Sequence, residues 1–165
     1  METGAVTVGI VGGTGDLGAG LARRLTRAGF RVVIGSRHES QAQAAADTIK
    51  GIGSEAGWST LQVSGASNLD AATAADIVFV TVPFSAHGVT LEGITDVVQE
   101  KVVVDVTVPL VPPKVARVQM PEGGSAGQIA QSILGDNVRV VSAMQNVAAA
   151  HLNSEEPIDC DVLVT

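Results

Sequence analysis

A glycine-rich segment between two apolar runs, residues 6–37, constrains the fold of this chain more than any other feature. Its sequence is VTVGIVGGTGDLGAGLARRLTRAGFRVVIGSR, which predicts a strand at 6–11, a tight turn, a helix that ends near Gly29, and a second strand that ends near Arg37. A strand, a helix and a second strand in this order form a parallel pair with a right-handed crossover. The expected fold class is therefore α/β.

Three glycines in this segment have the spacing of a dinucleotide-binding turn. Gly13, Gly15 and Gly18 satisfy the pattern G-x-G-x-x-G and lie between the expected strand and the expected helix. Gly13 permits the tight turn, Gly15 lets a pyrophosphate approach bare backbone, and Gly18 lets the helix pack closely on the strand. A glycine-rich turn without a ligand is the alternative. The elements on both sides favour a dinucleotide whose phosphates rest on the helix N-terminus.

The end of the second strand indicates which dinucleotide the chain prefers. NAD-binding chains place a carboxylate there, about 20 residues after the glycines, to bind the ribose 2′-hydroxyl. This chain instead has Ser36 and Arg37, and its next carboxylate is Glu39. A guanidinium and a hydroxyl donate hydrogen bonds that a 2′-phosphate accepts. The residues favour NADP, with an ordinary surface arginine as the alternative.

Composition limits the domain organisation and the partners. The chain has 165 residues, of which 45% are hydrophobic, so we expect one NADP-binding Rossmann domain over residues 1–165. The net charge of -7 argues against a nucleic acid or an anionic membrane as partner. Cys160 is the only cysteine, and no apolar stretch approaches the length of a membrane span. These features are typical of a cytoplasmic protein.

The remaining chain alternates apolar runs with helical patterns. With right-handed crossovers, this alternation predicts a doubly wound, mostly parallel sheet of the Rossmann type, in the strand order 3-2-1-4-5-6 with a possible extra edge strand. The expected strands after the first two lie near 60–63, at 77–82, at 101–108, at 138–144, and at 161–164 for the possible edge strand.

Two smaller features of the pattern also predict local structure. The first helix carries Arg23, Arg24 and Arg27 on the side away from its leucines, which is typical of a solvated face. Residues 110–113, LVPP, are expected to form a rigid extended loop because proline restricts its own backbone and that of the preceding residue.

Ligands of a doubly wound sheet bind where the winding reverses, at the carboxyl ends of the first and fourth strands. Val82, Pro83 and Phe84 follow the fourth strand, so we expect them beside the nicotinamide half of the cofactor. His87 comes next, and either it hydrogen-bonds a phosphate or ribose or it is a solvated loop residue. After the sixth strand, the small side chains of residues 147–149 leave room for a flat ring, with an ordinary helix start as the alternative.

Several segments together resemble one family of enzymes. They are GIVGGTGDLGAGLARRLTRAGFRVVIGSR, TVPF near the fourth strand, VTVPL after the fifth, and VVSAMQNVAAAHL near the sixth. The chain is similar over nearly its whole length to the NADPH-dependent coenzyme F420 reductases, also called F420:NADP oxidoreductases. GGTGDLG followed by GSR is much more specific than the glycine pattern alone.

The resemblance implies hydride transfer between NADPH and the deazaflavin coenzyme F420, which would lie over the nicotinamide. It implies that Ser36 and Arg37 bind the 2′-phosphate and that Val82 and Pro83 lie against the nicotinamide. Family members continue beyond the position of Thr165 into a helical part that closes the cleft and helps build a dimer. We therefore expect a homodimer, or a partner that supplies this part. The remaining implied contacts are those of the pyrophosphate with Thr14, Gly15, Asp16 and Leu17, and those of both rings with Asn146, Val147, Ala148 and Ala149.

The residues predict neither a catalytic side chain nor a metal site. The chain contains no tyrosine, which excludes a short-chain dehydrogenase that uses Tyr and Lys. Direct hydride transfer needs no nucleophile, because it depends on holding two ring faces close together in a dry cleft. Two other functions remain open: a non-catalytic or truncated NADP-binding module, and an NADPH-dependent reductase of another acceptor, such as an F420 precursor.

Overall fold

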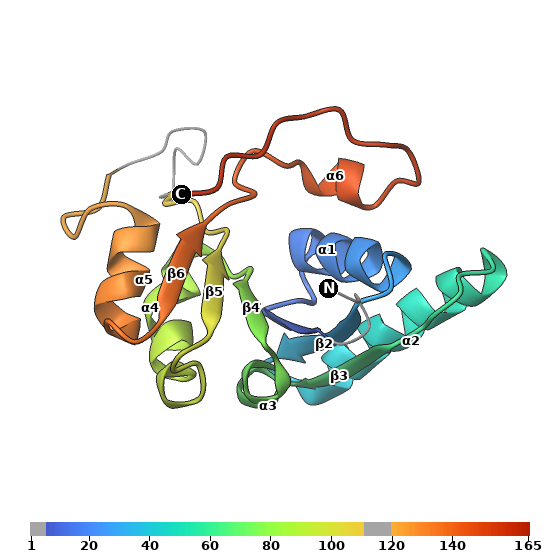
Figure 1. The fold of residues 1–165 in the computed structure, drawn as a ribbon, viewed down its shortest axis with the longest axis horizontal. Coiled ribbons are helices and arrows are strands. Elements are labelled where there is room, and N and C mark those ends of the chain that lie inside the picture. Colours follow the sequence, from blue (N-terminus) through green and yellow to red (C-terminus); the bar gives the residue numbers. More distant parts are fainter. Residues whose placement is uncertain (1–5, 111–119) are drawn as a thin grey trace.

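A six-stranded parallel sheet with helices on both faces forms the centre of the molecule (Figure 1). The computed structural model describes residues 6–110 and 120–165. The strand order is β3-β2-β1-β4-β5-β6, which confirms the expected Rossmann-type fold. The strands are β1 (Thr7–Val11), β2 (Arg31–Ser36), β3 (Val63–Ser67), β4 (Ile77–Val80), β5 (Val102–Asp105) and β6 (Arg139–Ser142).

Two apolar layers hold the helices against the sheet. On one face, Leu21 of the first helix and Ala46 of the second pack with Ile34 of β2. On the other face, Ala72 and Leu91 belong to a second cluster that also includes buried residues of β4 and β5. All five side chains are buried, so both faces of the sheet are covered. The helices are α1 (Asp16–Arg27), α2 (Glu39–Glu55), α3 (Asn68–Ala74), α4 (Phe84–Glu92), α5 (Ala126–Leu134) and α6 (Ala149–Leu152), with a 3-10 helix at Thr95–Val97.

The strand register brings the carboxyl ends of the strands to one edge of the sheet. Val11 pairs with Val80, Val80 pairs with Asp105, and Asp105 pairs with Ser142. The last residue of each of these four strands therefore lies in one row across the sheet. Loops that leave this row necessarily meet above β1 and β4, where the winding reverses.

The third strand lies later in the chain than the expected position near 60–63. It spans Val63–Ser67, a stretch of small and polar residues that by propensity indicates a turn. Gly65 explains the difference, because a Cβ atom at this position would overlap the backbone of Ala42 and Gln43 in α2. The helix thus lies directly on the strand, and that tertiary contact requires glycine in place of a strand-forming side chain.

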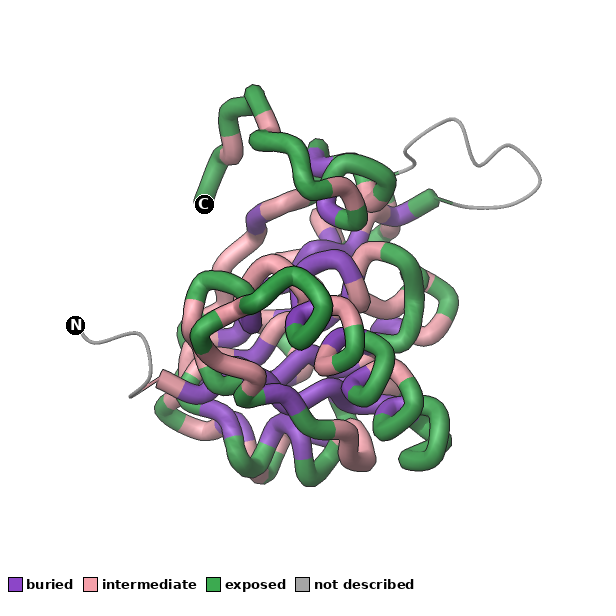
Figure 2. The backbone as a smooth tube through the Cα atoms, turned by 90° about the vertical axis from the view of Figure 1, so that its right-hand side faces the viewer, coloured by how far each residue is buried: buried purple, intermediate pink, exposed green. Residues whose placement is uncertain are grey.

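The segment after α6, residues 153–165, returns to the sheet without forming the expected edge strand. Its only ladder contact among the described residues is an antiparallel bridge between Ala143 and Val164, next to two backbone hydrogen bonds between Ser142 and Thr165. Most of this C-terminal segment is exposed (Figure 2). The extended loop expected at 110–113 lies, except for Leu110, outside the described residues.

The arginines of α1 bind the C-terminal segment, so the expected solvated face is only partly confirmed: the side chain of Arg27 is 46% exposed and that of Arg23 is 16% exposed. The guanidinium and Nε of Arg24 donate to four backbone carbonyls within residues 151–156, at 2.6–3.0 Å. Arg23 and Arg27 both pair with the carboxylate of Glu155. The first helix therefore anchors the chain that follows α6, and the C-terminal carbonyls of a short helix obtain charged donors.

Two glycine substitutions test the close approach of α2 to β3. We expect Gly65→Ala to lower the free energy of unfolding by about 2 kcal/mol, because the added methyl group has no room. Gly51→Ala is the matched control within α2, where an added Cβ meets nothing within 4 Å, and it should raise the free energy of unfolding by about 1 kcal/mol. Denaturant titration measures both; equal effects would contradict the packing assigned to Gly65.

Candidate functional site

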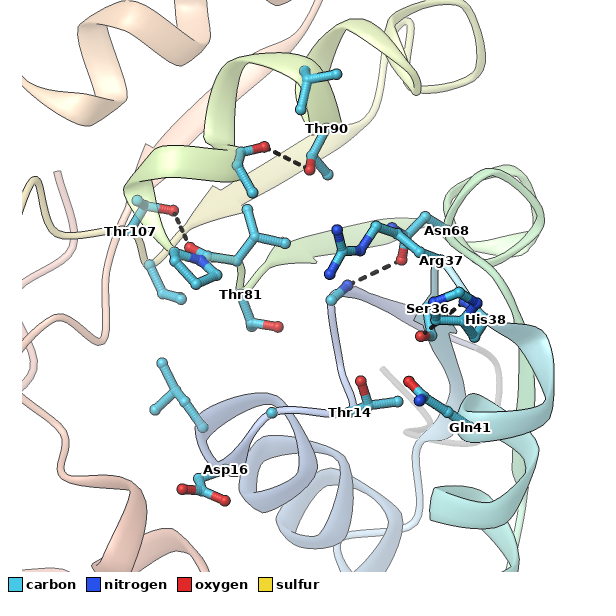
Figure 3. A pocket seen from close by; sticks show the side chains of 18 of the residues that line it. Thr14, Asp16, Ser36, Arg37, His38, Gln41, Asn68, Thr81, Thr90 and Thr107 are labelled. Atoms are coloured by element: carbon cyan, nitrogen blue, oxygen red, sulfur yellow. Dashed lines mark hydrogen bonds between the residues drawn. The ribbon is translucent and has the colours of Figure 1, made fainter.

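A cavity of about 500 Å³ lies at the edge of the sheet where the strands end, beside the glycine turn (Figure 3). Its size is in the range of pockets that bind small molecules and cofactors. The lining combines the turn after β1, the end of β2, the start of α3, and the segments after β4 and β5. The lining residues are Gly12, Thr14, Gly15, Asp16, Leu17, Ser36, Arg37, His38, Gln41, Asn68, Thr81, Val82, Pro83, Ala86, Val89, Thr90, Val106, Thr107, Val108 and Leu110.

The glycine turn has one residue in a left-handed conformation, one open position and one close contact. Gly12 has φ of 74°, a left-handed conformation that favours glycine, and its N–H donates to Oδ1 of Asn68 at 3.1 Å. A Cβ at Gly18 would lie 2.6 Å from Cα of Gly13, so the packing role predicted for Gly18 is confirmed. A Cβ at Gly15 would meet only a carbonyl oxygen at 3.9 Å. The backbone at Gly15 is therefore open to a ligand, as its proposed contact with a pyrophosphate requires.

Cationic and polar side chains gather at the β2 end of the cavity. Arg37, His38 and Gln41 line it together with Ser36, whose Oγ accepts the N–H of His38 at 3.2 Å (Figure 3). None of the ion pairs within the described parts of the chain involves Arg37. Its guanidinium is thus available to a phosphate, which it would bind with charge-assisted hydrogen bonds.

The segments after β4 and β5 form the other end of the cavity, which is mainly apolar. Val82, Pro83, Val106 and Val108 line this end, where the hydroxyl of Thr107 donates to the carbonyl of Val82 at 3.3 Å. This hydrogen bond ties the two segments together (Figure 3). An apolar wall of this kind suits a flat ring rather than a charged group.

Phe84, expected beside the nicotinamide, and His87, expected to contact a phosphate or ribose or to be solvated, do not line the cavity. Phe84 begins α4, and its ring stacks near that of His87, with 6.0 Å between the ring centroids. His87 is 1% exposed, so the solvated alternative is wrong, and its Nε2 lies 3.0 Å from Oδ2 of Asp105. The contact with a phosphate or ribose is also not supported, because the imidazole is enclosed within the fold. Helix α4 begins directly after Pro83, which turns the His87 position inward.

The loop after β6 also lies apart from the cavity lining. Val147 is 9% exposed and packs in the same cluster as Leu21, and Ala149 begins α6. The side-chain amide of Asn146 donates to the carbonyl of Asp161 in the C-terminal segment at 2.7 Å. Ring contacts of residues 146–149, which the family resemblance implies, remain a prediction that this geometry does not support.

Sequence reasoning missed part of the lining. Asn68 and His38 line the cavity although they are distant from the glycine turn in the sequence. Val89 and Thr90 also line it, from the outward side of α4. The signal for His38 was its position directly after Arg37. Asn68 had a weaker signal, as a polar residue at the carboxyl end of a strand next to β2. The positions in α4 required the orientation of that helix.

Neither a metal-binding cluster nor a membrane-spanning helix is found among the described residues. No group of three or more His, Cys, Asp or Glu side chains could hold a metal ion. No described helix combines the length and the apolar character needed to cross a membrane.

Together, the sheet order, the glycine turn and the cavity define a Rossmann-type dinucleotide-binding domain. The family model described as "NADP oxidoreductase coenzyme F420-dependent" matches residues 7–109. The chain is also 42% identical, over 95% of its length, to the F420-dependent NADP reductase of Methanothermobacter thermautotrophicus. It belongs to the family of F420-dependent NADP reductases, which are oxidoreductases.

Two further similarities agree with this assignment. The F420-dependent NADP reductase of Methanocaldococcus jannaschii is 37% identical over 95% of the chain. The chain spans 68% of the length of the Methanothermobacter relative and 71% of the Methanocaldococcus relative. A crystal structure from Arthrobacter sp. FB24, assigned to the same group of reductases, superposes with a TM-score of 0.71 at 22% identity, over 88% of this chain and 64% of that one. At this identity, the superposition shows the fold alone.

Asn68 offers a test of how the glycine turn is held. We expect Asn68→Ala to lower the free energy of unfolding by about 1 kcal/mol, because the N–H of Gly12 loses its acceptor. We also expect NADPH to bind about tenfold more weakly, which corresponds to about 1.4 kcal/mol, because the turn loses its fixed position.

The control is Ser125→Ala, which removes the capping box of α5, outside the cavity lining. It should cost about 1 kcal/mol of stability and leave NADPH affinity unchanged. Calorimetric titration and denaturant unfolding measure the two quantities. Unchanged NADPH affinity in the Asn68 variant would contradict the role given to this side chain.

Proposed function

We propose that this chain catalyses hydride transfer between NADPH and coenzyme F420 at the cavity beside the glycine turn. One observation supports this function above the others: the cavity joins a cationic end at Ser36 and Arg37 to an apolar end at Val82 and Pro83. The open backbone of Gly15 follows β1, which lies between β2 and β4 in the sheet. These three parts of the cavity suit, in turn, the 2′-phosphate, the pyrophosphate and the nicotinamide of NADP.

The residues of the site fit NADP. Gly15 is the N-cap residue of α1 and has no side chain that could cap the helix. The N–H groups of Asp16 and Leu17 in the first helical turn therefore have no side-chain cap and suit a pyrophosphate. Arg37 and Ser36 supply the donors that a 2′-phosphate accepts, and no carboxylate occupies the end of β2. Thr14 and Gln41 add polar side chains at this end.

The protein contributes position and exclusion of water to this reaction. NADPH held by these residues would supply a hydride, with its electron pair, to the deazaflavin. Val82, Pro83 and Val106 offer apolar surface to a ring, and the bond from Thr107 to Val82 holds the two segments in register. No side chain has to exchange a proton with the carbon atoms that give and receive the hydride, in agreement with the lack of a predicted catalytic residue.

Assembly and location are part of the same proposal. We place the protein in the cytoplasm, which is supported by the exposed free thiol of Cys160. We also propose that a second copy or a partner segment covers the deazaflavin side of the cavity, as the family resemblance implies. Light scattering with and without NADPH distinguishes a monomer from a dimer.

Turnover tests the proposed function directly. Mixing the protein with NADPH and F420 should change the F420 absorbance at a catalytic rate, while NADPH binding is recorded on the same sample. The inactive control is Gly15→Leu, because a Cβ at this position meets only a carbonyl oxygen at 3.9 Å and the longer side chain would fill the open position next to the backbone. This variant should abolish both signals. Binding without turnover would indicate a non-catalytic NADP-binding module. Oxidation of NADPH by another acceptor alone would indicate a reductase of that acceptor.

Arg37 tests the preference for NADP. We expect Arg37→Ala to weaken NADPH binding by about tenfold or more, because a charge-assisted pair is lost, and to change NADH binding by less than about twofold. Arg31→Ala is the matched control, since this exposed arginine begins β2 outside the cavity. Fluorescence titration of both reduced cofactors measures the effect, and equal weakening of NADPH and NADH would show that the 2′-phosphate assignment is wrong.

A further inference from the structure

A buried histidine–aspartate pair lies behind the apolar end of the cavity. His87 in α4 and Asp105 at the end of β5 are each 1% exposed, and Nε2 of the imidazole lies 3.0 Å from Oδ2 of the carboxylate. A carboxylate oxygen accepts, so Nε2 carries the hydrogen of this bond. Nδ1 has no hydrogen-bond partner among the described residues. The polar contact of this imidazole is therefore directed at Asp105.

The second carboxylate oxygen of Asp105 accepts a hydrogen bond from a residue of the cavity wall. Oδ1 of Asp105 accepts the backbone N–H of Thr107 at 3.1 Å. Thr107 lines the cavity, and its hydroxyl donates to the carbonyl of Val82 at 3.3 Å. The buried pair is thus connected, through one backbone amide and one hydroxyl, to both segments that form the apolar end.

The segment that follows β6 also binds the backbone of Asp105. Its carbonyl accepts from Nε2 of Gln145 at 2.9 Å and from the N–H of Ala143 at 3.3 Å. Met144 between these two residues has φ of 70°, an uncommon conformation for a side chain of this size. The segments that leave β4, β5 and β6 therefore meet at this single aspartate.

Burial makes this arrangement sensitive to substitution. A carboxylate that is removed from water needs hydrogen-bond donors, and here the donors are one imidazole and one backbone amide. Loss of the imidazole would leave Oδ2 unsatisfied. The carboxylate would then turn or admit water, and either change moves the amide of Thr107 and the wall at Val82.

We propose that His87 and Asp105 are positioning residues that set the wall against which the nicotinamide half of NADPH lies. This inference rests on the proposed function, since the wall matters because hydride transfer requires a fixed ring. Neither side chain lines the cavity. A displacement of about 1 Å at such a site lowers the rate of transfer by up to about a hundredfold.

The experiment compares His87→Leu with His87→Gln. Leucine fills similar space but has no donor, whereas the glutamine amide offers an N–H to Oδ2 of Asp105. Leu91→Val is the control, because it removes buried volume from the same helix outside the cavity lining. The melting temperature is recorded for every variant, so that a general loss of stability is distinguished from a displacement of the cavity wall.

Two binding probes and one spectroscopic signal provide the readout. Adenosine 2′,5′-bisphosphate contacts only the end of the cavity at Arg37, whereas NADPH also occupies the apolar end. We expect His87→Leu to leave the affinity for the bisphosphate within about twofold, to weaken NADPH binding by about tenfold, and to reduce the fluorescence of bound nicotinamide. His87→Gln should restore NADPH affinity and fluorescence to near the wild-type values.

Asp105→Asn serves where the leucine variant does not fold. An NH2 group that faces Thr107 meets another N–H, and one that faces the imidazole moves the ring hydrogen to Nδ1, which has no partner among the described residues. Either way one buried donor loses its acceptor, and we expect the same selective loss of NADPH over the bisphosphate. A folded variant with a lower melting temperature but an unchanged affinity ratio would show that the pair is structural only. The same shift of the ratio in Leu91→Val would also overturn the inference.

Hydride transfer to F420 is measured last, in a single turnover. We expect it to fall by about tenfold or more in His87→Leu and to recover in His87→Gln. If the wild-type protein binds NADPH but does not reduce F420, the proposed function fails, while the affinity ratio and the nicotinamide fluorescence still decide the role of the pair.

Discussion

A close backbone contact joins α1 to the turn after β1, and the cavity depends on it. Any side chain at Gly18 would meet both the Cα of Gly13 and the hydroxyl of Thr81. Because all three positions are small, the first turn of α1 lies directly over the junction of β1 and β4. A larger residue at Gly18 would lift the helix, and its N-terminal amides would no longer face the row of strand ends.

Charge is distributed unevenly in a chain with a net charge of -7. Arg23, Arg24 and Arg27 on α1 are bonded to carbonyls and a carboxylate of the C-terminal segment, so they serve the fold. Arg37 has no such ion pair within the described residues. The overall negative field disfavours polyanions, while a single free guanidinium in a concave site still attracts one phosphate group.

Local sequence predicted the fold and the grouping of the glycine turn with Ser36 and Arg37 at one cavity, because both depend on neighbours in the chain. The glycine turn, Ser36 and Arg37 follow one another within one strand–helix–strand unit, whose geometry is set by hydrogen bonds and backbone preferences. The third strand was placed wrongly because Gly65 meets a tertiary requirement, the contact with α2, that propensity does not contain. The prediction for His87 was wrong for a related reason. Its partner, Asp105, lies 18 residues later in the chain and is brought close by the pairing of β4 with β5, which the local sequence does not contain.

The attachment of the C-terminal segment has a consequence for how the molecule opens. Arg24 holds one end of this segment to α1, and two backbone bonds between Ser142 and Thr165 hold the other end to β6. Few side chains between these two points are buried, so the segment contributes little apolar surface to the core. Hydrogen exchange in it should therefore proceed by detachment of the segment as one unit, at a lower free energy than global unfolding and without loss of the glycine turn.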